Sequence, residues 1–338
     1  MRLATLAIEI RMKYSEVLIF LLYEDPVLSS GSLRLRACPS VLFPWILGHA
    51  VFAHWFRFPF GVDLTRPHDV LNYTCNFYLN TEKEISVGVW HTLPSNQWDA
   101  ARGSTSPEWF RDALGDGRPV MIFLHGNGGT RAAEHRVGLV KKLSAAGFHV
   151  FSLDYRGFGD SSGDPTEAGV TDDALYLYHW VKEHSRGSSV SLWGQSLGTG
   201  IATNTAVRLQ KQDFDVEAVV LQAPFTNVRE MPYIFLPGFK GLIWTVMDKI
   251  EVEFANDKNL ETLTSPVLIL HAEDDSVVPS YMGKQLFDIS VRAHRQINKE
   301  QEVELVSYSA HLGYNHKNIY LDPNLENVVT SFFNKLKR

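Results

Sequence analysis

The sequence predicts an α/β domain, built as a doubly wound and mostly parallel sheet with helices on both faces. Two observations lead to this prediction. From residue 84 onward, short runs rich in β-branched and aromatic residues alternate with segments of helix length. Most of the later runs are almost continuously apolar, which is typical of strands buried on both faces. The spacers after Leu124 are long enough for crossover helices, and such crossovers are right-handed.

The composition limits the class of protein. A chain of 338 residues forms one large domain or two small ones, and 45% hydrophobic with 21% charged residues excludes a disordered or collagen-like chain. Lys and Arg number 32 against 38 Asp and Glu, a net charge of −6. This balance disfavours a nucleic-acid partner, because phosphate binding needs clustered basic residues. Cys38 and Cys75 are too few for a disulfide framework.

Residues 1–80 are predicted to form an apolar N-terminal segment ahead of a main domain over 81–338. Residues 17–23 are apolar but too short to span a bilayer, and no clean run of 18 apolar residues appears. The stretch 41–60 combines Trp and Phe with His and Arg, a mixture that suits a bilayer interface with one wet side. A helix packed on the main domain explains the same composition equally well.

Seven strands and two helix faces are expected in the main domain. The strands are Ile85–His91, Pro119–Leu124, His149–Asp154, Ser189–Trp193, Ala218–Gln222, Val267–His271 and Val303–Ser307. Apolar residues at helical spacing predict one buried helix face over about residues 170–181 and another on the last helix. The two faces are Val170, Ala174, Leu177 and Val181, and Leu325, Val328, Val329, Phe332, Phe333 and Leu336.

The alternation breaks between Gln222 and Val267, where there is too much chain for a single helix. This stretch is rich in Pro, Gly and bulky apolar residues, which predicts an irregular insertion over about 227–262. A cap over a site is one interpretation, and a surface element packed on the sheet is the other.

The strongest chemical motif is Gly194-Gln-Ser196-Leu-Gly198, directly after a predicted strand and before a helix-compatible run. This is G-x-S-x-G in the strand–turn–helix context that a nucleophile elbow requires. The turn is so sharp that both flanking positions need glycine, and the serine projects from a strained backbone. The helix N-terminus behind it offers free N–H groups to a developing oxyanion.

A serine hydroxyl is a weak nucleophile, so the motif predicts a base and an acid in loops after later strands. The strand ending at His271 is followed by an acidic turn, in which spacing alone does not choose between Asp274 and Asp275. After the next strand come His311 and His316, and spacing again leaves both open. His294 lies on a predicted helix before that strand, which makes it a poor candidate.

The glycine-rich loop His125-Gly-Asn-Gly-Gly129 follows another predicted strand, where it could supply a second oxyanion donor. Such a loop could also cradle a phosphate. The chain has neither G-x-x-x-x-G-K-S/T nor G-x-G-x-x-G, so the nucleotide interpretation is disfavoured. No metal cluster is predicted, because His179 and His184 are five residues apart, off one helix face, with no carboxylate motif.

Several segments, taken in order, closely resemble the lysophosphatidylserine lipase group of the α/β-hydrolases, which are membrane-associated serine lipases that also cleave monoacylglycerols. The resemblance covers about residues 60 to 338. Its segments are Asn72–Cys75, Gly88–Thr92, Asp154–Ser161, Gly194–Gly200, Ala223–Asn227, Phe254–Asp257, His271–Asp275 and Gly313–His316.

The resemblance implies a role for each matching residue. Ser196 matches the nucleophile, Asp275 the acid and His316 the base, the last in a Gly-Tyr-x-His-Lys context. Asn72 matches a glycosylated asparagine, which implies the luminal side of the endoplasmic reticulum membrane. The substrates implied are lysophospholipids, lysophosphatidylserine among them, and monoacylglycerols, met at a membrane surface.

Asn72-Tyr-Thr74 is itself an N-glycosylation sequon, although a chain of this length carries about one such tripeptide by chance. If it is used, everything after it lies in a secretory lumen. Arg2, Arg11 and Lys13 would stay cytosolic under the positive-inside tendency. A peripheral anchor that never crosses the bilayer, with the domain in the cytosol, is the alternative.

Two departures from the group concern substrate and topology. Position 195 is Gln where the group usually has His, which bears on substrate preference or rate rather than on the chemistry. The first forty residues do not look like the group's longer N-terminal region with its membrane span.

The expected chemistry is a two-step acyl transfer with no cofactor, in which backbone N–H groups of Leu197 and Asn127 hold the oxyanion. A soluble esterase or acyl-peptidase on the same fold is the alternative within enzymes, since fold and triad do not fix the substrate. A non-enzymatic binding protein is a third class. It is disfavoured because Ser196, Asp275 and His316 are all present.

Overall fold

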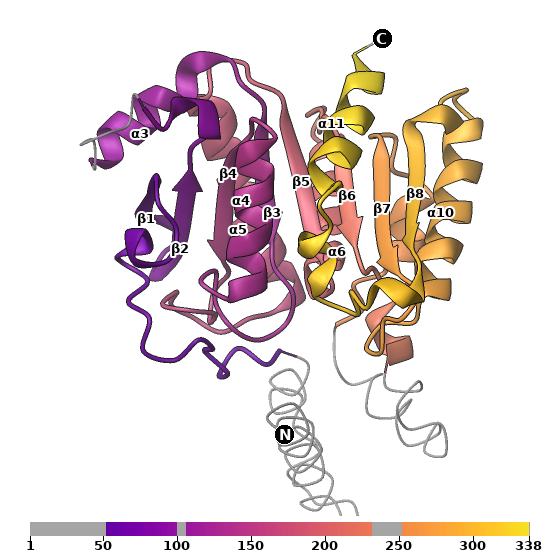
Figure 1. The fold of residues 1–338 in the computed structure, drawn as a ribbon, viewed down its shortest axis with the longest axis horizontal. Coiled ribbons are helices and arrows are strands. Elements are labelled where there is room, and N and C mark those ends of the chain that lie inside the picture. The colour runs from indigo at the N-terminus through magenta and orange to yellow at the C-terminus, as the bar shows by residue number, and fades with distance from the viewer. Residues whose placement is uncertain (1–51, 100–105, 232–251, 338) are drawn as a thin grey trace, which may run out of the picture.

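The computed structural model describes residues 52–99, 106–231 and 252–337, and these form one eight-stranded sheet flanked by helices (Figure 1). The strand order is β1-β2-β4-β3-β5-β6-β7-β8. Strand β2 runs antiparallel to both β1 and β4, and the six strands β3 to β8 are parallel to one another. The strands are β1 (Thr74–Glu82), β2 (Ile85–Thr92), β3 (Val120–Leu124), β4 (His149–Asp154), β5 (Val190–Gln195), β6 (Val219–Gln222), β7 (Val267–Ala272) and β8 (Val303–Tyr308).

Helices cover both faces of the sheet, which confirms the predicted α/β class. The α-helices are α3 (Pro107–Ala113), α4 (Glu134–Ala145), α5 (Glu167–His184), α6 (Leu197–Gln210), α9 (Asn256–Leu260), α10 (Ser280–Arg295) and α11 (Leu325–Leu336). Short 3-10 turns occur at Pro67–Asp69, Ser95–Gln97, Leu114–Asp116, Val228–Glu230, Glu300–Glu302, Ala310–Leu312 and Asn318–Leu321. Helices α4 and α11 lie together on one face, and α5, α6 and α10 pack on the other (Figure 1).

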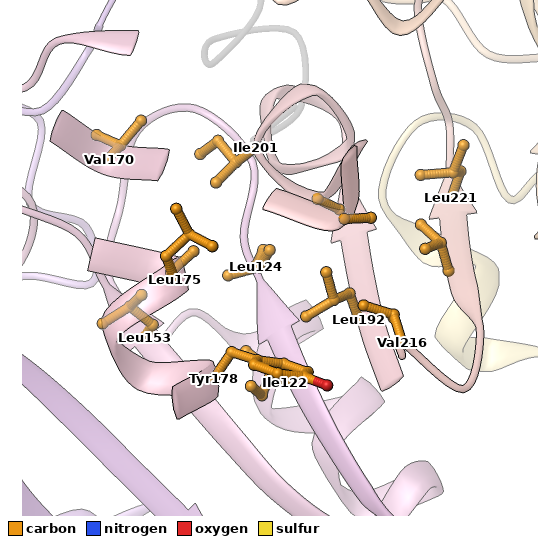
Figure 2. Close-up of a cluster of buried hydrophobic side chains, with 14 of the residues drawn as sticks. Ile122, Leu124, Leu153, Val170, Leu175, Tyr178, Leu192, Ile201, Val216 and Leu221 are labelled. Carbon is orange, nitrogen blue, oxygen red and sulfur yellow. The ribbon is translucent and has the colours of Figure 1, made fainter. Parts of the chain in front are cut away.

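The core consists of two apolar layers, one on each face of the sheet. Figure 2 shows part of the layer beneath α5 and α6, where Val170 and Ile201 lie above strand residues such as Ile122 and Leu192. The predicted face of α5 is fully buried. Burial of one large apolar side chain stabilises a fold by about 1.5–3 kcal/mol, so these layers hold the strand ends, and the loops beyond them, in place.

Strand β1 was not expected from the sequence. It pairs with β2 at the edge of the sheet, and of its nine residues only Thr74, Cys75 and Leu79 are buried. An edge strand with one wet face lacks the continuous apolar run that marks the central strands. The usable signal is the period-two alternation of Cys75, Phe77 and Leu79.

The packed domain begins before residue 81, so the predicted boundary between residues 80 and 81 is placed too late. Residues from β1 lie in the sheet, and Phe52 is 1% exposed against Phe158 and Phe254. Leu64 and Leu71 also lie in the core. The part of the apolar stretch 41–60 before Phe52 lies outside the described residues. None of the helices in the described ranges is long and apolar enough to cross a bilayer.

The predicted insertion over 227–262 is shorter than expected on its C-terminal side. Val252, Phe254 and Leu260 are buried in the core of the main domain. The two ends of the insertion are joined by a hydrogen bond from Val228 N–H to the Glu253 carbonyl. Residues 232–251, which include most of the predicted cap, lie outside the described residues.

Candidate active site

Ser196 occupies a sharp turn between β5 and α6, as the motif predicts. Its φ is 52° and its ψ is −118°, a conformation that L-residues rarely adopt. A Cβ atom at Gly194 would overlap the carbonyl oxygen of Gly198, and one at Gly198 would overlap the carbonyl oxygen of Leu124. Both glycines are therefore required by close backbone approach, and the strained serine is held out at the edge of the sheet.

The structure brings the three predicted residues together from three separate loops. His316 Nε2 lies 2.9 Å from Ser196 Oγ, and His316 Nδ1 lies 2.8 Å from Asp275 Oδ2. Ser196 is partly exposed, whereas the Asp275 side chain is fully buried. This chain of contacts is the geometry of nucleophile, base and orienting acid.

Of the two acids that spacing left open, only Asp275 contacts the imidazole. Its Oδ1 accepts the backbone N–H groups of Val277 and Val278, both at 2.8 Å. Asp274 points instead toward the backbone N–H of Asn315, which it accepts at 3.0 and 3.1 Å. The two neighbouring carboxylates therefore contact different parts of the loop that carries His316: Asp274 its backbone at Asn315, and Asp275 the imidazole.

Of the remaining histidines, His311 and His294 are held elsewhere. His311 is exposed, and its Nδ1 lies 2.8 Å from Ser309 Oγ within its own turn. His294 is buried, with its two ring nitrogens 3.0 Å from the carbonyls of Ser290 and Ser265. Neither is placed to take a proton from Ser196.

A second histidine beside the acid was missed from the sequence. His271, at the end of β7, places Nε2 2.9 Å from the Val278 carbonyl and 3.3 Å from Asp275 Oδ2. Burial alone would raise the pKa of Asp275, but hydrogen bonds from His271 and His316 outweigh it and hold that pKa well below its usual value. Asp275 is thus an anion in direct contact with the His316 imidazole.

The predicted oxyanion loop lies against the nucleophile. A Cβ atom built on Gly126 would come within 3.2 Å of Ser196 Cβ, so this loop lies close against the serine. Leu197 is the first residue of α6, and the N–H groups of a first helical turn have no partner within the helix. Asn127 accepts the backbone N–H of Ala53 through its side-chain Oδ1 at 2.8 Å.

An unexpected partner of this loop is the segment 52–60. Gly129 N–H donates to the Phe56 carbonyl at 2.6 Å, and Thr130 N–H donates to the Phe58 carbonyl at 2.9 Å. In Figure 1 this segment runs beneath the ends of the strands where the triad loops lie. The sequence carries no local signal for this contact, because it joins residues about seventy positions apart.

The same segment exposes an aromatic cluster, which we define as Phe56, Phe58 and Phe60. The ring centroids lie 5.6–6.2 Å apart, and Phe60 is 71% exposed. Trp55, 60% exposed, precedes the cluster. Exposed apolar side chains are unremarkable singly, but a contiguous group marks an interaction surface.

Gln195, the residue that departs from the resembling group, is 3% exposed and pairs in register with Gln222 on β6. Within the described part of the chain, its Oε1 has no hydrogen-bond partner. His179 and His184 contact Gln212 and the Trp180 carbonyl, away from the triad. Among the described residues, no three His, Cys, Asp or Glu side chains are placed to hold a metal ion.

Comparison with known proteins places this fold and site in a family. A family model described as the alpha/beta hydrolase fold matches residues 119–247. A lysophosphatidylserine lipase, ABHD12, of Gallus gallus is 45% identical, with 86% of this chain and 78% of that protein covered. ABHD12 of Xenopus tropicalis is 41% identical over 94% and 83%, and human Protein ABHD12B is 44% identical over 84% and 79%.

Solved structures of lower identity share the fold. An α/β-hydrolase from Vibrio vulnificus superposes with a TM-score of 0.62 at 17% identity, covering 84% of this chain and 92% of that one. The esterase Pf2001 of Pyrococcus furiosus superposes with a TM-score of 0.58 at 18% identity, covering 80% and 92%.

The fold and these relatives define a serine ester hydrolase. The chain belongs to the α/β-hydrolase family and, within it, to the lysophosphatidylserine lipase group of the ABHD12 relatives.

Proposed function

We propose that this protein hydrolyses the acyl ester of lysophospholipids, lysophosphatidylserine first among them, and of monoacylglycerols. The observation that carries the chemistry is the unbroken contact chain from Ser196 Oγ through His316 to Asp275, with links of 2.9 and 2.8 Å. The choice of substrate is supported by the relatives, which are lysophosphatidylserine lipases by name and 41–45% identical.

In the first step, Ser196 Oγ attacks the ester carbonyl while His316 Nε2 takes its proton. The tetrahedral oxyanion is held by backbone N–H groups, for which Leu197 and Asn127 are the candidates. Removal of one such donor typically costs about 100- to 1000-fold in rate. His316 then returns the proton to the glycerol oxygen, the ester C–O bond breaks, and the glycerol product leaves.

In the second step, His316 takes a proton from water as that water attacks the acyl-serine carbonyl. Collapse of the second tetrahedral intermediate returns the proton to Ser196 and releases the fatty acid. Throughout, Asp275 holds the imidazole through Nδ1 and stabilises its charged form. The anionic state of Asp275, maintained by His271 and the Val277 and Val278 amides, supports this role.

A membrane surface is proposed as the place where the enzyme meets its substrate. The aromatic cluster at Phe56, Phe58 and Phe60 is exposed and forms the C-terminal part of the apolar stretch 41–60. Its backbone is hydrogen-bonded to the loop beside Ser196. Aromatic side chains favour the bilayer interface, so the cluster would bring the active site to the lipid.

The luminal side of the endoplasmic reticulum is the proposed location of the catalytic domain. It is supported by the exposed position of Asn72, which leaves room for a glycan in the folded protein. The proposal carries a definite consequence, namely an attached sugar chain.

A substrate panel tests the function. Wild type and Ser196→Ala are compared on lysophosphatidylserine, other lysophospholipids, a monoacylglycerol and a short soluble ester. We expect wild type to release fatty acid from the lipids, and Ser196→Ala to lose both this activity and labelling by a fluorophosphonate probe. Activity on the short ester alone would replace the lipid function by that of a soluble esterase, and labelling that survives in Ser196→Ala would move the nucleophile elsewhere.

A further inference from the structure

Arg136 is a buried arginine in the first turn of α4, 3% exposed. Its guanidinium group donates to three backbone carbonyls of the glycine-rich loop. Nη1 reaches the carbonyl of Thr130 at 2.9 Å, and Nη2 reaches those of Gly126 at 2.9 Å and Gly128 at 2.5 Å. These are alternate residues, so one side chain fixes one edge of the whole loop.

The opposite edge of the loop is held by backbone contacts. The N–H groups of Gly129 and Thr130 donate to the carbonyls of segment 52–60. Gly128 and Gly129 have φ values of 69° and 68°, a left-handed conformation that favours glycine. Arg136 and the segment 52–60 thus hold the glycine-rich loop from two sides.

The contact at Gly126 has a direct consequence for the oxyanion site. The Gly126 carbonyl and the Asn127 N–H belong to one planar trans peptide unit, in which the two groups point in opposite directions. Arg136 holds the carbonyl, and His125 Nδ1 lies 2.8 Å from the same oxygen. The direction of the Asn127 N–H is thereby set, and the adjoining Gly126 backbone lies close to Ser196.

Arg136 forms no salt bridge with a carboxylate of the described residues, although the charge of Asp154 is near enough to favour its cationic form. The other two buried arginines do pair with carboxylates, Arg131 with Asp154 and Arg156 with Asp173. The hydrogen bonds of Arg136 within the described ranges go only to carbonyls, and its Nε is buried without an acceptor there. Burial lowers the pKa of Arg136 to about 10, so the group stays cationic at neutral pH. An unpaired buried charge is costly, and beside a developing oxyanion it is also useful.

We propose that Arg136 is a positioning residue of the oxyanion hole, which orients the Asn127 N–H through the Gly126 carbonyl and adds a fixed positive charge behind it. The proposal rests on the acyl-transfer chemistry proposed above. It predicts an effect on the transition state rather than on substrate binding, since the substrate carbonyl carries little charge before attack.

The test compares Arg136→Met and Arg136→Lys with a matched control, Arg156→Lys, which alters a buried arginine in the loop after β4. Activity on lysophosphatidylserine and on p-nitrophenyl butyrate is measured per folded molecule, beside the melting temperature. We expect Arg136→Met to lower kcat by about 100- to 1000-fold with KM changed by less than about threefold, as for loss of an oxyanion donor. Arg136→Lys, which keeps the charge, should recover part of this loss.

The inhibition constant of a trifluoromethyl ketone separates positioning of the oxyanion hole from a general role of Arg136 in stability. The adduct of this ketone with Ser196 places an oxyanion in the oxyanion hole. Its Ki should rise in Arg136→Met in proportion to the loss of kcat/KM and stay unchanged in Arg156→Lys. Unchanged kcat and Ki in a folded Arg136→Met would overturn the proposal. If Arg136→Met does not fold, the comparison of Arg136→Lys with Arg156→Lys decides. Equal kcat and equal Ki in these two variants would overturn the proposal. Wild type inactive on every ester would instead refute the proposed function.

Discussion

Asp274 accepts the backbone N–H of Asn315 through both carboxylate oxygens, at 3.0 and 3.1 Å. Asn315 directly precedes His316 and has a φ of 48°, so the loop that carries the base is bent at this contact. Its side-chain Oδ1 lies 3.0 Å from Ser276 Oγ and accepts the backbone N–H of Ser276 at 3.2 Å. The acid turn and the base loop are thus joined by a contact that lies outside the triad itself.

The two neighbouring acids are expected to differ sharply on mutation. Asp275→Asn keeps the shape of the turn but favours the wrong imidazole tautomer, which in the best-studied triad costs about 10,000-fold in kcat. Asp274→Asn retains an amide oxygen for the Asn315 N–H and should cost about tenfold or less, through looser placement of His316. Steady-state hydrolysis of a lysophospholipid measures both. A severe loss of activity in Asp274→Asn alone would identify Asp274, rather than Asp275, as the catalytic acid.

Among the histidines of the C-terminal loop, His316 should be indispensable. His316→Ala removes the base that lies 2.9 Å from Ser196 Oγ, and we expect activity to fall by several orders of magnitude because triad members act as a unit. His311→Ala is the matched control, since His311 is exposed on the same loop and contacts only its own turn in the described structure. Initial rates for the two variants are compared with wild type. Comparable losses in both variants would contradict the assignment.

The stability of the protein should fall in acid because of a buried histidine pair. His91 Nε2 lies 2.9 Å from His149 Nδ1, and both side chains are buried. Burial lowers the pKa of His149 to about 4, in spite of the nearby Asp116, and burial together with His149 lowers the pKa of His91 well below its ordinary value. The unfolded chain takes up these protons near pH 6.5, whereas the folded chain resists them.

The free energy of unfolding is therefore not reduced by this pair above about pH 6.5, and it decreases as the pH falls from there toward 4. From His149 alone, we expect a loss of about 2 kcal/mol in the free energy of unfolding at about pH 5. Urea unfolding of wild type and His149→Gln at about pH 7.5 and about pH 5 measures it. The variant should lose less stability between the two conditions, and an equal loss would remove His149 as the cause.

Glycosylation of Asn72 tests where the domain lies. The Asn72 side chain is exposed, whereas Thr74 of the sequon is buried and its hydroxyl contacts Thr92 Oγ1 at 2.8 Å. Transfer of the sugar would therefore precede folding of β1. We expect the full chain, expressed in mammalian cells, to shift in mobility with endoglycosidase H. The shift should be absent in Asn72→Gln, and a wild type without it would place the domain in the cytosol.

Most of the central sheet could be predicted from the sequence, because buried parallel strands are apolar on both faces and need no knowledge of their neighbours. The seven predicted strands agree with β2 to β8 to within a few residues. Strand β1 was missed since an edge strand such as Thr74–Glu82 buries few of its side chains and so has no continuous apolar run. The domain boundary was misplaced for the same reason, and because Phe52 reaches the core through contacts with residues over a hundred positions away.

The sequence by itself determined the nucleophile elbow, because a strained serine between two glycines is a local requirement of the backbone at residues 194–198. It also determined the order of acid and base along the chain. Only the tertiary structure decided which of two adjacent carboxylates meets the imidazole, since Asp274 and Asp275 differ in direction rather than in spacing. The hydrogen bonds from Arg136 to the glycine-rich loop likewise depend on how α4 packs against the sheet. Such contacts follow from the packing of distant segments, which leaves no periodic or compositional trace at the residues themselves.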